Sequence, residues 1–150
     1  MGYYDEISRS YNQLHGEEQK KKFNLIKKYI RGRVLDVGCG TGISTPEGGI
    51  GIDPSKELLK QNPHECYQAS AENIPFPDKS FDTVICLTSV HNFSDIEKGL
   101  REMKRVGKST FIISVLKKSP RFNMIVAKIK QIIEPDREID EEKDLILVKT

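Results

Sequence analysis

The segment Val34-Leu35-Asp36-Val37-Gly38-Cys39-Gly40-Thr41-Gly42 decides the fold of this chain. Its first half is largely apolar, as in a parallel strand that is covered on both faces. Three glycines follow at alternate positions, and glycine lets the backbone turn tightly and approach a ligand closely. Because nucleotide-like cofactors bind outside the carboxyl ends of parallel strands, the segment predicts a strand that leads directly into a cofactor-binding turn.

The spacing of the glycines narrows the class of cofactor. Dinucleotide sites use G-x-G-x-x-G, and here Ile43 stands where the third glycine would be, which argues against a nicotinamide dehydrogenase. The run from Asp36 to Gly42 resembles instead the first motif of class I S-adenosylmethionine-dependent methyltransferases. That resemblance implies a cofactor site that includes Asp36, Gly38, Cys39, Gly40 and Gly42. For Cys39, a small residue at a tight turn is a better interpretation than a nucleophile.

A second predicted strand, residues 50–53, ends in Asp53 and is followed by Pro54. In α/β nucleotide folds a carboxylate at this place accepts hydrogen bonds from ribose hydroxyls. We therefore expect Asp53 and Pro54 to border the ribose. The alternative is that Asp53 only begins a turn before the proline.

The segment 71–82, Ala-Glu-Asn-Ile-Pro-Phe-Pro-Asp-Lys-Ser-Phe-Asp, carries a second resemblance. It is similar to the part of the ubiquinone/menaquinone biosynthesis methyltransferases that runs past the adenine into the fourth strand. The resemblance implies that Ala71 and Glu72 border the adenine, with Ile74 near its face. Ordinary loop packing is the alternative for Ile74.

The strand predicted at 83–87 ends beside the expected substrate. By resemblance, main-chain carbonyls near Leu87 contact the amino group of the cofactor, and His91 and Asn92 face the substrate. An imidazole titrates near neutrality, so His91 could act as a base, although a packed surface histidine is the alternative. Tyr4 and Tyr11 lie in a segment that resembles the part of the family folded over the pocket; a helix that anchors its aromatic residues in a core groove is equally compatible. No residue is identified as catalytic.

The remaining pattern alternates helices with strands, which predicts a Rossmann-like, doubly wound α/β sheet. A helix is expected over 17–31, with Phe23, Ile26 and Ile30 inward and five lysines, Lys22 among them, in solvent. Ser55 is expected to cap a helix over 56–61. Ser94 and Glu97 form the pattern of a capping box. Further elements are expected at 65–69, 110–116 and 145–148 (strands) and at 121–133 (helix).

The resemblance implies the strand order 3-2-1-4-5, with the C-terminal strand antiparallel beside the fifth. We expect one domain over 1–150, made of an N-terminal helical segment (1–33), a cofactor-binding core (34–116) and a shortened C-terminal part (117–150). Only 12 residues, 38–49, connect the first two strands, whereas a parallel crossover normally needs a dozen or more and a helix. The crossover helix should therefore be a single turn or absent. No inserted segment long enough for a substrate lid follows the fifth strand.

The composition of the chain limits the classes of partner, metal and compartment that we expect. No run approaches the roughly 20 apolar residues of a membrane span. Three cysteines without a C-x-x-C pair argue against a disulfide framework or structural zinc and suit the cytoplasm, and we expect no metal. Residues 98–130 carry ten Lys/Arg against one acid, and residues 134–144 carry seven acids against two bases. Such asymmetry can mark a surface for nucleic acid, but it is more often a set of solvated helix faces.

The sequence as a whole predicts methyl transfer from S-adenosylmethionine, with S-adenosylhomocysteine as the product, to an unidentified acceptor that is expected to be a small molecule. One alternative is a non-catalytic, cofactor-binding subunit that activates a partner protein. Another is methylation of RNA bound by residues 98–130.

Overall fold

Seven strands form one sheet in the order β3-β2-β1-β4-β5-β7-β6 in the computed structural model, which describes residues 3–150, with side chains for Leu14 and from Gly16 onward. The parallel strands are β1 (Val34–Val37), β2 (Ile50–Asp53), β3 (Glu65–Gln68), β4 (Phe81–Leu87) and β5 (Gly107–Leu116). The antiparallel ones are β7 (Asp144–Lys149), beside β5, and β6 (Arg137–Asp140), at the edge. The predicted Rossmann-like fold and strand order are confirmed. β6 was not predicted, because three of its four residues are charged and remain exposed at the edge of the sheet.

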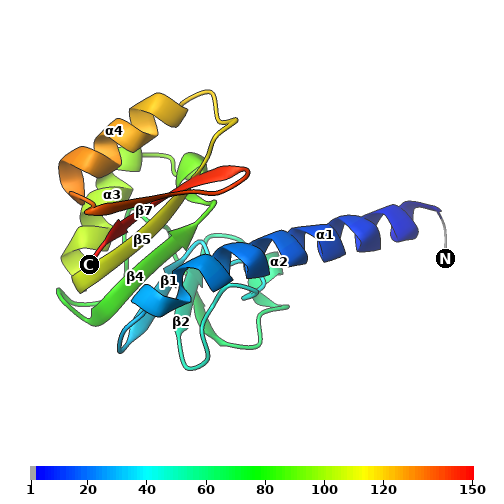
Figure 1. Ribbon diagram of the computed structural model, residues 1–150. Helices are drawn as coiled ribbons and strands as arrows, with labels where there is room; N and C mark the ends of the chain where they lie inside the picture. Colours follow the sequence, from blue (N-terminus) through cyan, green and yellow to red (C-terminus); the bar gives the residue numbers. More distant parts are fainter. Residues whose placement is uncertain (1–2) are drawn as a thin grey trace.

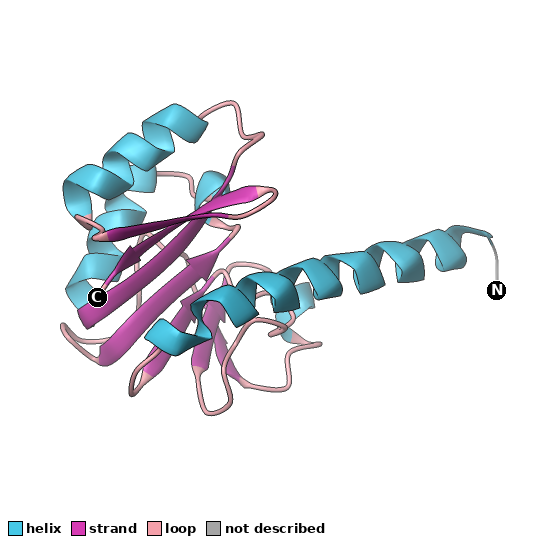
Figure 2. Ribbon diagram, in the orientation of Figure 1, coloured by secondary structure: helices cyan, strands magenta, loops and turns pink. Residues whose placement is uncertain are grey.

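Helices cover both faces of this sheet (Figures 1 and 2). On one face, α3 (Ile96–Val106) and α4 (Phe122–Ile132) bury Leu100, Met103 and Ile129 in the main core. On the other face, the C-terminal half of α1 (Tyr3–Ile26) packs Ile26 into a smaller cluster with Ile85 of β4 and Ile146 of β7. Its N-terminal part extends beyond the sheet in Figure 1. The sheet is therefore covered on both faces, as continuous apolar strands require.

The end of α1 differs from the prediction. The helix ends at Ile26, a 3-10 turn, η1 (Lys27–Tyr29), follows, and Ile30 is extended, so no helix continues to residue 31. Lys22 was expected in solvent, but only 4% of its surface is exposed. Helical periodicity could not place it inside, because its partner, Asp144, lies more than 100 residues away in the sequence.

The cap of α3 also differs from the prediction by one residue. Asp95, not Ser94, is the N-cap, and its Oδ1 accepts a hydrogen bond from the backbone N–H of Lys98 at 3.1 Å. Aspartate is as good an N-cap as serine, so the sequence allowed both positions. Glu97 does not close a capping box; it pairs with Lys128 at 3.0 Å and links α3 to α4. The predicted Ser55 cap is confirmed on the short helix α2 (Lys56–Leu59), where Ser55 Oγ accepts from Leu58 N–H.

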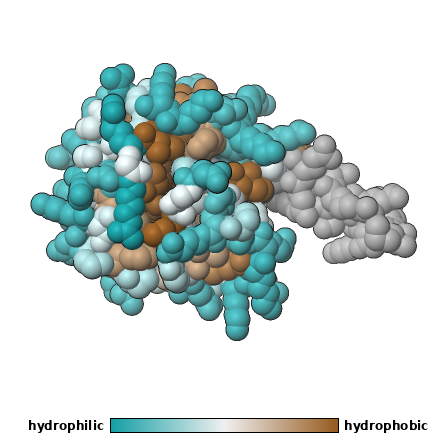
Figure 3. Space-filling model, turned by 90° about the horizontal axis from the view of Figure 1, so that it is seen from below, coloured by the Kyte–Doolittle hydropathy of each residue, from teal (hydrophilic) through white to brown (hydrophobic). Residues whose placement is uncertain are grey.

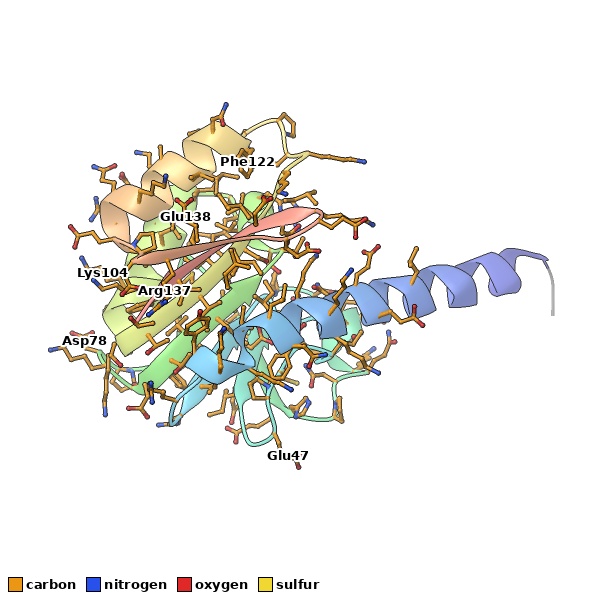
Figure 4. The ribbon with its side chains drawn as sticks, in the orientation of Figure 1. Glu47, Asp78, Lys104, Phe122, Arg137 and Glu138 are labelled. Atoms are coloured by element: carbon orange, nitrogen blue, oxygen red, sulfur yellow. The ribbon has the colours of Figure 1, made fainter. Side chains whose placement is uncertain are left out.

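The crossover between β1 and β2 contains no helix; residues 38–49 form turns, as their small number predicts. α1 lies beside this loop, since a Cβ placed on Gly16 would be 3.7 Å from Cδ1 of Ile43. Glu47 marks the outer tip of the loop and points away from the body (Figure 4).

The face shown in Figure 3 is mostly hydrophilic, with apolar residues gathered near its centre. Six of the ten basic residues in 98–130 form ion pairs with acidic side chains; these are Arg101, Arg105, Lys108, Lys117, Lys128 and Lys130. Much of the charge asymmetry along the sequence is therefore balanced within the fold. Among the described residues, no helix combines the length and apolarity needed to cross a membrane.

Candidate cofactor site

The glycine turn after β1 is fixed to the end of β2 by backbone hydrogen bonds. The N–H groups of Gly38 and Cys39 both donate to the carbonyl of Ile52, at 2.8 and 3.0 Å. Gly38, Gly40 and Gly42 have φ values of +76°, +52° and +85°, a region that favours glycine. The parallel register, which pairs Val37 with Ile52, brings the turn to the carboxyl edge of the sheet.

The three glycines have different reasons to be there. A Cβ on Gly38 would lie 2.6 Å from Ser89, and one on Gly42 would lie 2.4 Å from Oδ1 of Asn62. A Cβ on Gly40 would meet only Cδ1 of Leu58, at an unstrained 3.8 Å. Packing thus excludes side chains at the first and third positions, whereas the backbone of Gly40 faces open space. A ligand can approach the main chain at this point, which fits a nucleotide-type cofactor.

Asp53 lies directly beside that open position. Its Oδ2 accepts from the N–H of Gly40 at 3.0 Å, and its Oδ1 accepts from the N–H of Ser55 at 2.8 Å. Only 8% of the residue is exposed, while Pro54 next to it is exposed. A carboxylate oxygen has two lone pairs, so each one keeps capacity for a ligand hydroxyl. The structure therefore brings Asp53 and Gly40 together at the glycine turn, as the sequence predicts.

Asp36 and Cys39 lie beneath the turn. Asp36 is 2% exposed and accepts a hydrogen bond from the hydroxyl of Thr45 at 2.7 Å. Burial raises the pKa of Asp36 to about 7, against the lowering effect of that hydrogen bond, and the nearby Asp53 raises it further. Burial likewise raises the pKa of the Cys39 thiol, which packs against Gly51. A buried, protonated thiol is inert, which agrees with a small packing residue at this position.

The loop from Ala69 to Ser80 is the next part of the candidate site. The N–H of Ala69 donates to the carbonyl of Asp53 at 3.2 Å, which joins the loop to β2. Ala71 is buried, and Glu72 is half-buried with an Oε2 that has no hydrogen-bond partner among the described residues. Ile74, only 2% exposed, packs in the main core, so the packing alternative accounts for its burial.

Arg105 of α3 holds this loop in place. Its guanidinium donates to the carbonyls of Ile74 and Phe76, both at 2.9 Å, and to Asp78 at 2.9 Å. Two more hydrogen bonds join it to Glu102, whose Oε1 also accepts from the N–H of Ile74. The Glu102 and Asp78 carboxylates raise the pKa of Arg105, and the hydrogen-bonded Arg105 guanidinium in turn holds the pKa of Glu102 below its usual range. Asp78 lies at the outer end of the loop before β4 (Figure 4).

The segment that follows β4 contacts the glycine turn. Leu87 is buried. The hydroxyl of Ser89 donates to the carbonyl of Leu87 and to the carbonyl of Gly38, each at 3.2 Å. His91 follows in the 3-10 turn η2 (Val90–Asn92), half-buried, with a buried Nδ1 that has no partner in the described part of the chain. Burial lowers the pKa of His91; Asp144 raises it and Arg121 lowers it. The imidazole is therefore neutral at pH 7 and can accept a proton. Asn92 is exposed.

Tyr4 and Tyr11, expected near the substrate, have side chains outside the described ones, although both lie within the bounds of α1.

Comparison with known proteins agrees with this geometry. A family model described as a methyltransferase domain matches residues 35–115, from β1 to β5. The chain belongs to this methyltransferase family. This membership makes S-adenosylmethionine its cofactor, and the open position at Gly40 with Asp53 beside it fits such a group.

Two curated relatives and one solved structure show the range of the similarity. The chain is 36% identical over 90 residues to an uncharacterised Bacillus subtilis methyltransferase, YcgJ, and the match covers 49% of this chain and 36% of that protein. The chain is 32% identical over 130 residues to the ubiquinone/menaquinone biosynthesis C-methyltransferase of Hahella chejuensis, and the match covers 72% of this chain and 52% of that protein. The chain thus spans about half or less of these relatives. A SAM-dependent methyltransferase structure from Thermotoga maritima shares the fold at a TM-score of 0.77 and 17% identity, covering 99% of this chain and 95% of that one.

A hollow of about 530 Å³ lies beside α3; its lining includes Glu72 of the loop described above, Lys98, Arg101 and Arg105, but no residue of the glycine turn. Its wall consists largely of charged residues. Among the described residues, no group of three or more His, Cys, Asp or Glu is arranged to hold a metal ion, and the three cysteines are free.

Sequence reasoning missed several residues that shape the methyltransferase site. Asn62 donates to the carbonyl of Gly40 at 3.1 Å, and Ser89 packs on Gly38. Arg105 of α3 holds the loop from Ala69 to Ser80, although β4 separates that loop from α3 in the sequence. The i, i+3 spacing of Glu102 and Arg105 was visible in the sequence, but it could not reveal their contacts with the loop.

Proposed function

We propose that this methyltransferase transfers a methyl group from S-adenosylmethionine to a small-molecule acceptor, in the cytoplasm. The observation that carries the proposal is the glycine turn, where only the Gly40 backbone faces open space and Asp53 lies 3.0 Å from its N–H. Family membership supports the cofactor, and the three free cysteines suit a reducing compartment.

The residues divide into three roles under this proposal. Asp53 accepts hydrogen bonds from the ribose hydroxyls, and Ala71 and Glu72 border the adenine. The main chain at Gly38 and Gly40 lies along the methionine end, together with the carbonyl of Leu87. His91 and Asn92 face the acceptor, and the neutral imidazole of His91 can take a proton from it.

Methyl transfer from S-adenosylmethionine requires few catalytic groups from the protein. S-adenosylmethionine, when bound, supplies a methyl group that its positively charged sulfur already activates. The protein then needs to position the acceptor and exclude water, which together account for large accelerations. The absence of an identified acid–base triad is therefore compatible with the activity.

The paired basic residues favour a small molecule over RNA. Six of the ten cations in 98–130 pair with acidic side chains, so this region presents less net positive charge to phosphates than its sequence suggests. Incubation of the protein with methyl-labelled cofactor and a cell extract, separated afterwards into small-molecule, RNA and protein fractions, tests this choice. Label in the small-molecule fraction is expected. Label in RNA, or label that depends on an added extract protein, would favour one of the alternatives.

A further inference from the structure

A buried polar cluster lies where α1, β4, β5 and β7 meet. It consists of Lys22, Thr88, Ser114 and Asp144, and we call it the Thr88 cluster. Lys22 is 4% exposed and Asp144 is fully buried, and their Nζ and Oδ2 atoms are 3.4 Å apart. Neither residue belongs to the cofactor turn, and they come from opposite ends of the chain.

Thr88 is the centre of the cluster. Its hydroxyl accepts from Lys22 Nζ at 3.1 Å and donates to Asp144 Oδ2 at 2.5 Å. Its backbone N–H donates to Ser114 Oγ at 2.7 Å. Three separate segments of the chain therefore hold this one residue.

The conformation of Thr88 needs that support. Its φ is +55°, in the left-handed region, which is an outlier for a β-branched residue. Such strain persists only where the surroundings enforce it, and it concentrates at functional sites. A buried ion pair, in turn, is weak evidence for stability, because the cost of removing two charges from water can exceed their attraction. The buried ion pair of Lys22 and Asp144 therefore contacts the residue whose backbone is strained, Thr88.

The turn at Thr88 determines where Ser89 lies, and Ser89 supports the glycine turn. Ser89 Oγ donates to the carbonyl of Gly38 at 3.2 Å, and its side chain fills the space of a Cβ on Gly38. If Thr88 relaxed to a negative φ, Ser89 would move away from Gly38. The carbonyl of Leu87, immediately before Thr88, would move as well.

We propose that Lys22 and Asp144 are positioning residues for the cofactor site: they hold Thr88 in its left-handed turn and thereby place Ser89 against the glycine turn. This inference rests on the proposed function, since it concerns the affinity of the same site. It also explains why a lysine of α1 is buried against a residue of the last strand.

The test compares buried and exposed ion pairs between the same two parts of the chain. The variant K22M/D144L replaces the buried pair with apolar side chains and leaves no charge unpaired. The control K21M/E142Q removes the neighbouring pair, whose side chains are 68% and 72% exposed. We expect K22M/D144L to bind S-adenosylhomocysteine at least 10-fold more weakly in calorimetry while it still unfolds cooperatively, and the control to bind within about twofold of the unmodified protein.

A glycine at position 88 distinguishes an effect on the backbone turn at this residue from a general loss of stability. Glycine adopts a positive φ without strain, so adding T88G to K22M/D144L should restore at least half of the lost binding free energy. An affinity that falls equally with and without the glycine would overturn the proposal, as would an unchanged affinity in K22M/D144L.

If K22M/D144L does not fold, single variants decide. T88V keeps the branched side chain and loses the hydroxyl bonds, so it should weaken binding at least fivefold more than T88G; equal effects would overturn the proposal. If the unmodified protein itself does not bind S-adenosylhomocysteine, the proposed function fails first, and this inference fails with it.

Discussion

The buried carboxyl of Asp36 makes the stability of the protein depend on pH. Its pKa rises from 3.8 in the unfolded chain to about 7 in the folded protein, because the ionised form loses its hydration. Between these values the folded state binds a proton that the unfolded state does not, so stability falls as pH rises. At roughly 1.4 kcal/mol per pH unit below the folded pKa, the rise from pH 5 to pH 8 removes about 3 kcal/mol, and stability levels off above pH 8.

Substitution of Asp36 by Asn isolates the contribution of this carboxyl to the pH dependence of stability from the contributions of the other titrating groups. Asp36→Asn keeps an oxygen that can accept from Thr45, at 2.7 Å in the native protein, but it does not titrate. Urea unfolding of both proteins at pH 5 and pH 8 gives the difference in unfolding free energy. That difference should shift in favour of the Asn variant by about 3 kcal/mol between the two pH values. A difference that is the same at both would refute the raised pKa.

Three further predictions concern the candidate site. Arg105→Met leaves the carbonyls of Ile74 and Phe76 without this donor and takes two hydrogen bonds from Glu102, so urea unfolding should show a loss of about 2–3 kcal/mol. Arg105→Lys lacks the planar fork and should recover less than half of that loss; full recovery would contradict the bidentate role. Asp53→Ala should weaken S-adenosylhomocysteine binding by about 1–3 kcal/mol in calorimetry, and an unchanged affinity would remove Asp53 from the site. His91→Gln should leave the affinity for S-adenosylhomocysteine within about twofold. Once an acceptor is known, the variant should also lose the acidic limb of the pH–rate profile, which in the unmodified protein should lie below pH 6.5 because burial lowers the pKa of His91. An identical pH–rate profile in the variant would exclude His91 as a base.

The sequence was sufficient for the central sheet because local signals and the fold agree there. The apolar runs at 34–37 and 83–87 became β1 and β4, and the short connection 38–49 lacks a helix, as its length requires. The glycine turn and Asp53 could be anticipated because consecutive parallel strands end at the same edge of the sheet.

Contacts between distant parts of the chain could not be anticipated. The sequence predicts Lys22 on the solvent-exposed face of its helix together with the neighbouring lysines, although it is buried against Asp144. β6 escaped notice because Arg137 and Glu138 made it look like a charged loop, and at the edge of the sheet both remain exposed. The three glycines of the turn also looked alike, and only their surroundings show that Gly40 alone faces open space.

That open space gives the most direct test of the cofactor site. Gly40→Ala and Gly48→Ala place the same methyl group on backbones with φ of +52° and +79°, and in both places it meets no atom closer than 3.8 Å. Both variants should therefore lose similar stability, about 1 kcal/mol, but only a methyl group at position 40 would enter the space assigned to the cofactor. In calorimetry with S-adenosylhomocysteine, we predict that Gly48→Ala binds like the unmodified protein and that Gly40→Ala binds at least 10-fold more weakly. Equal affinities in the two variants, or no binding by the unmodified protein at millimolar ligand, would contradict the assignment.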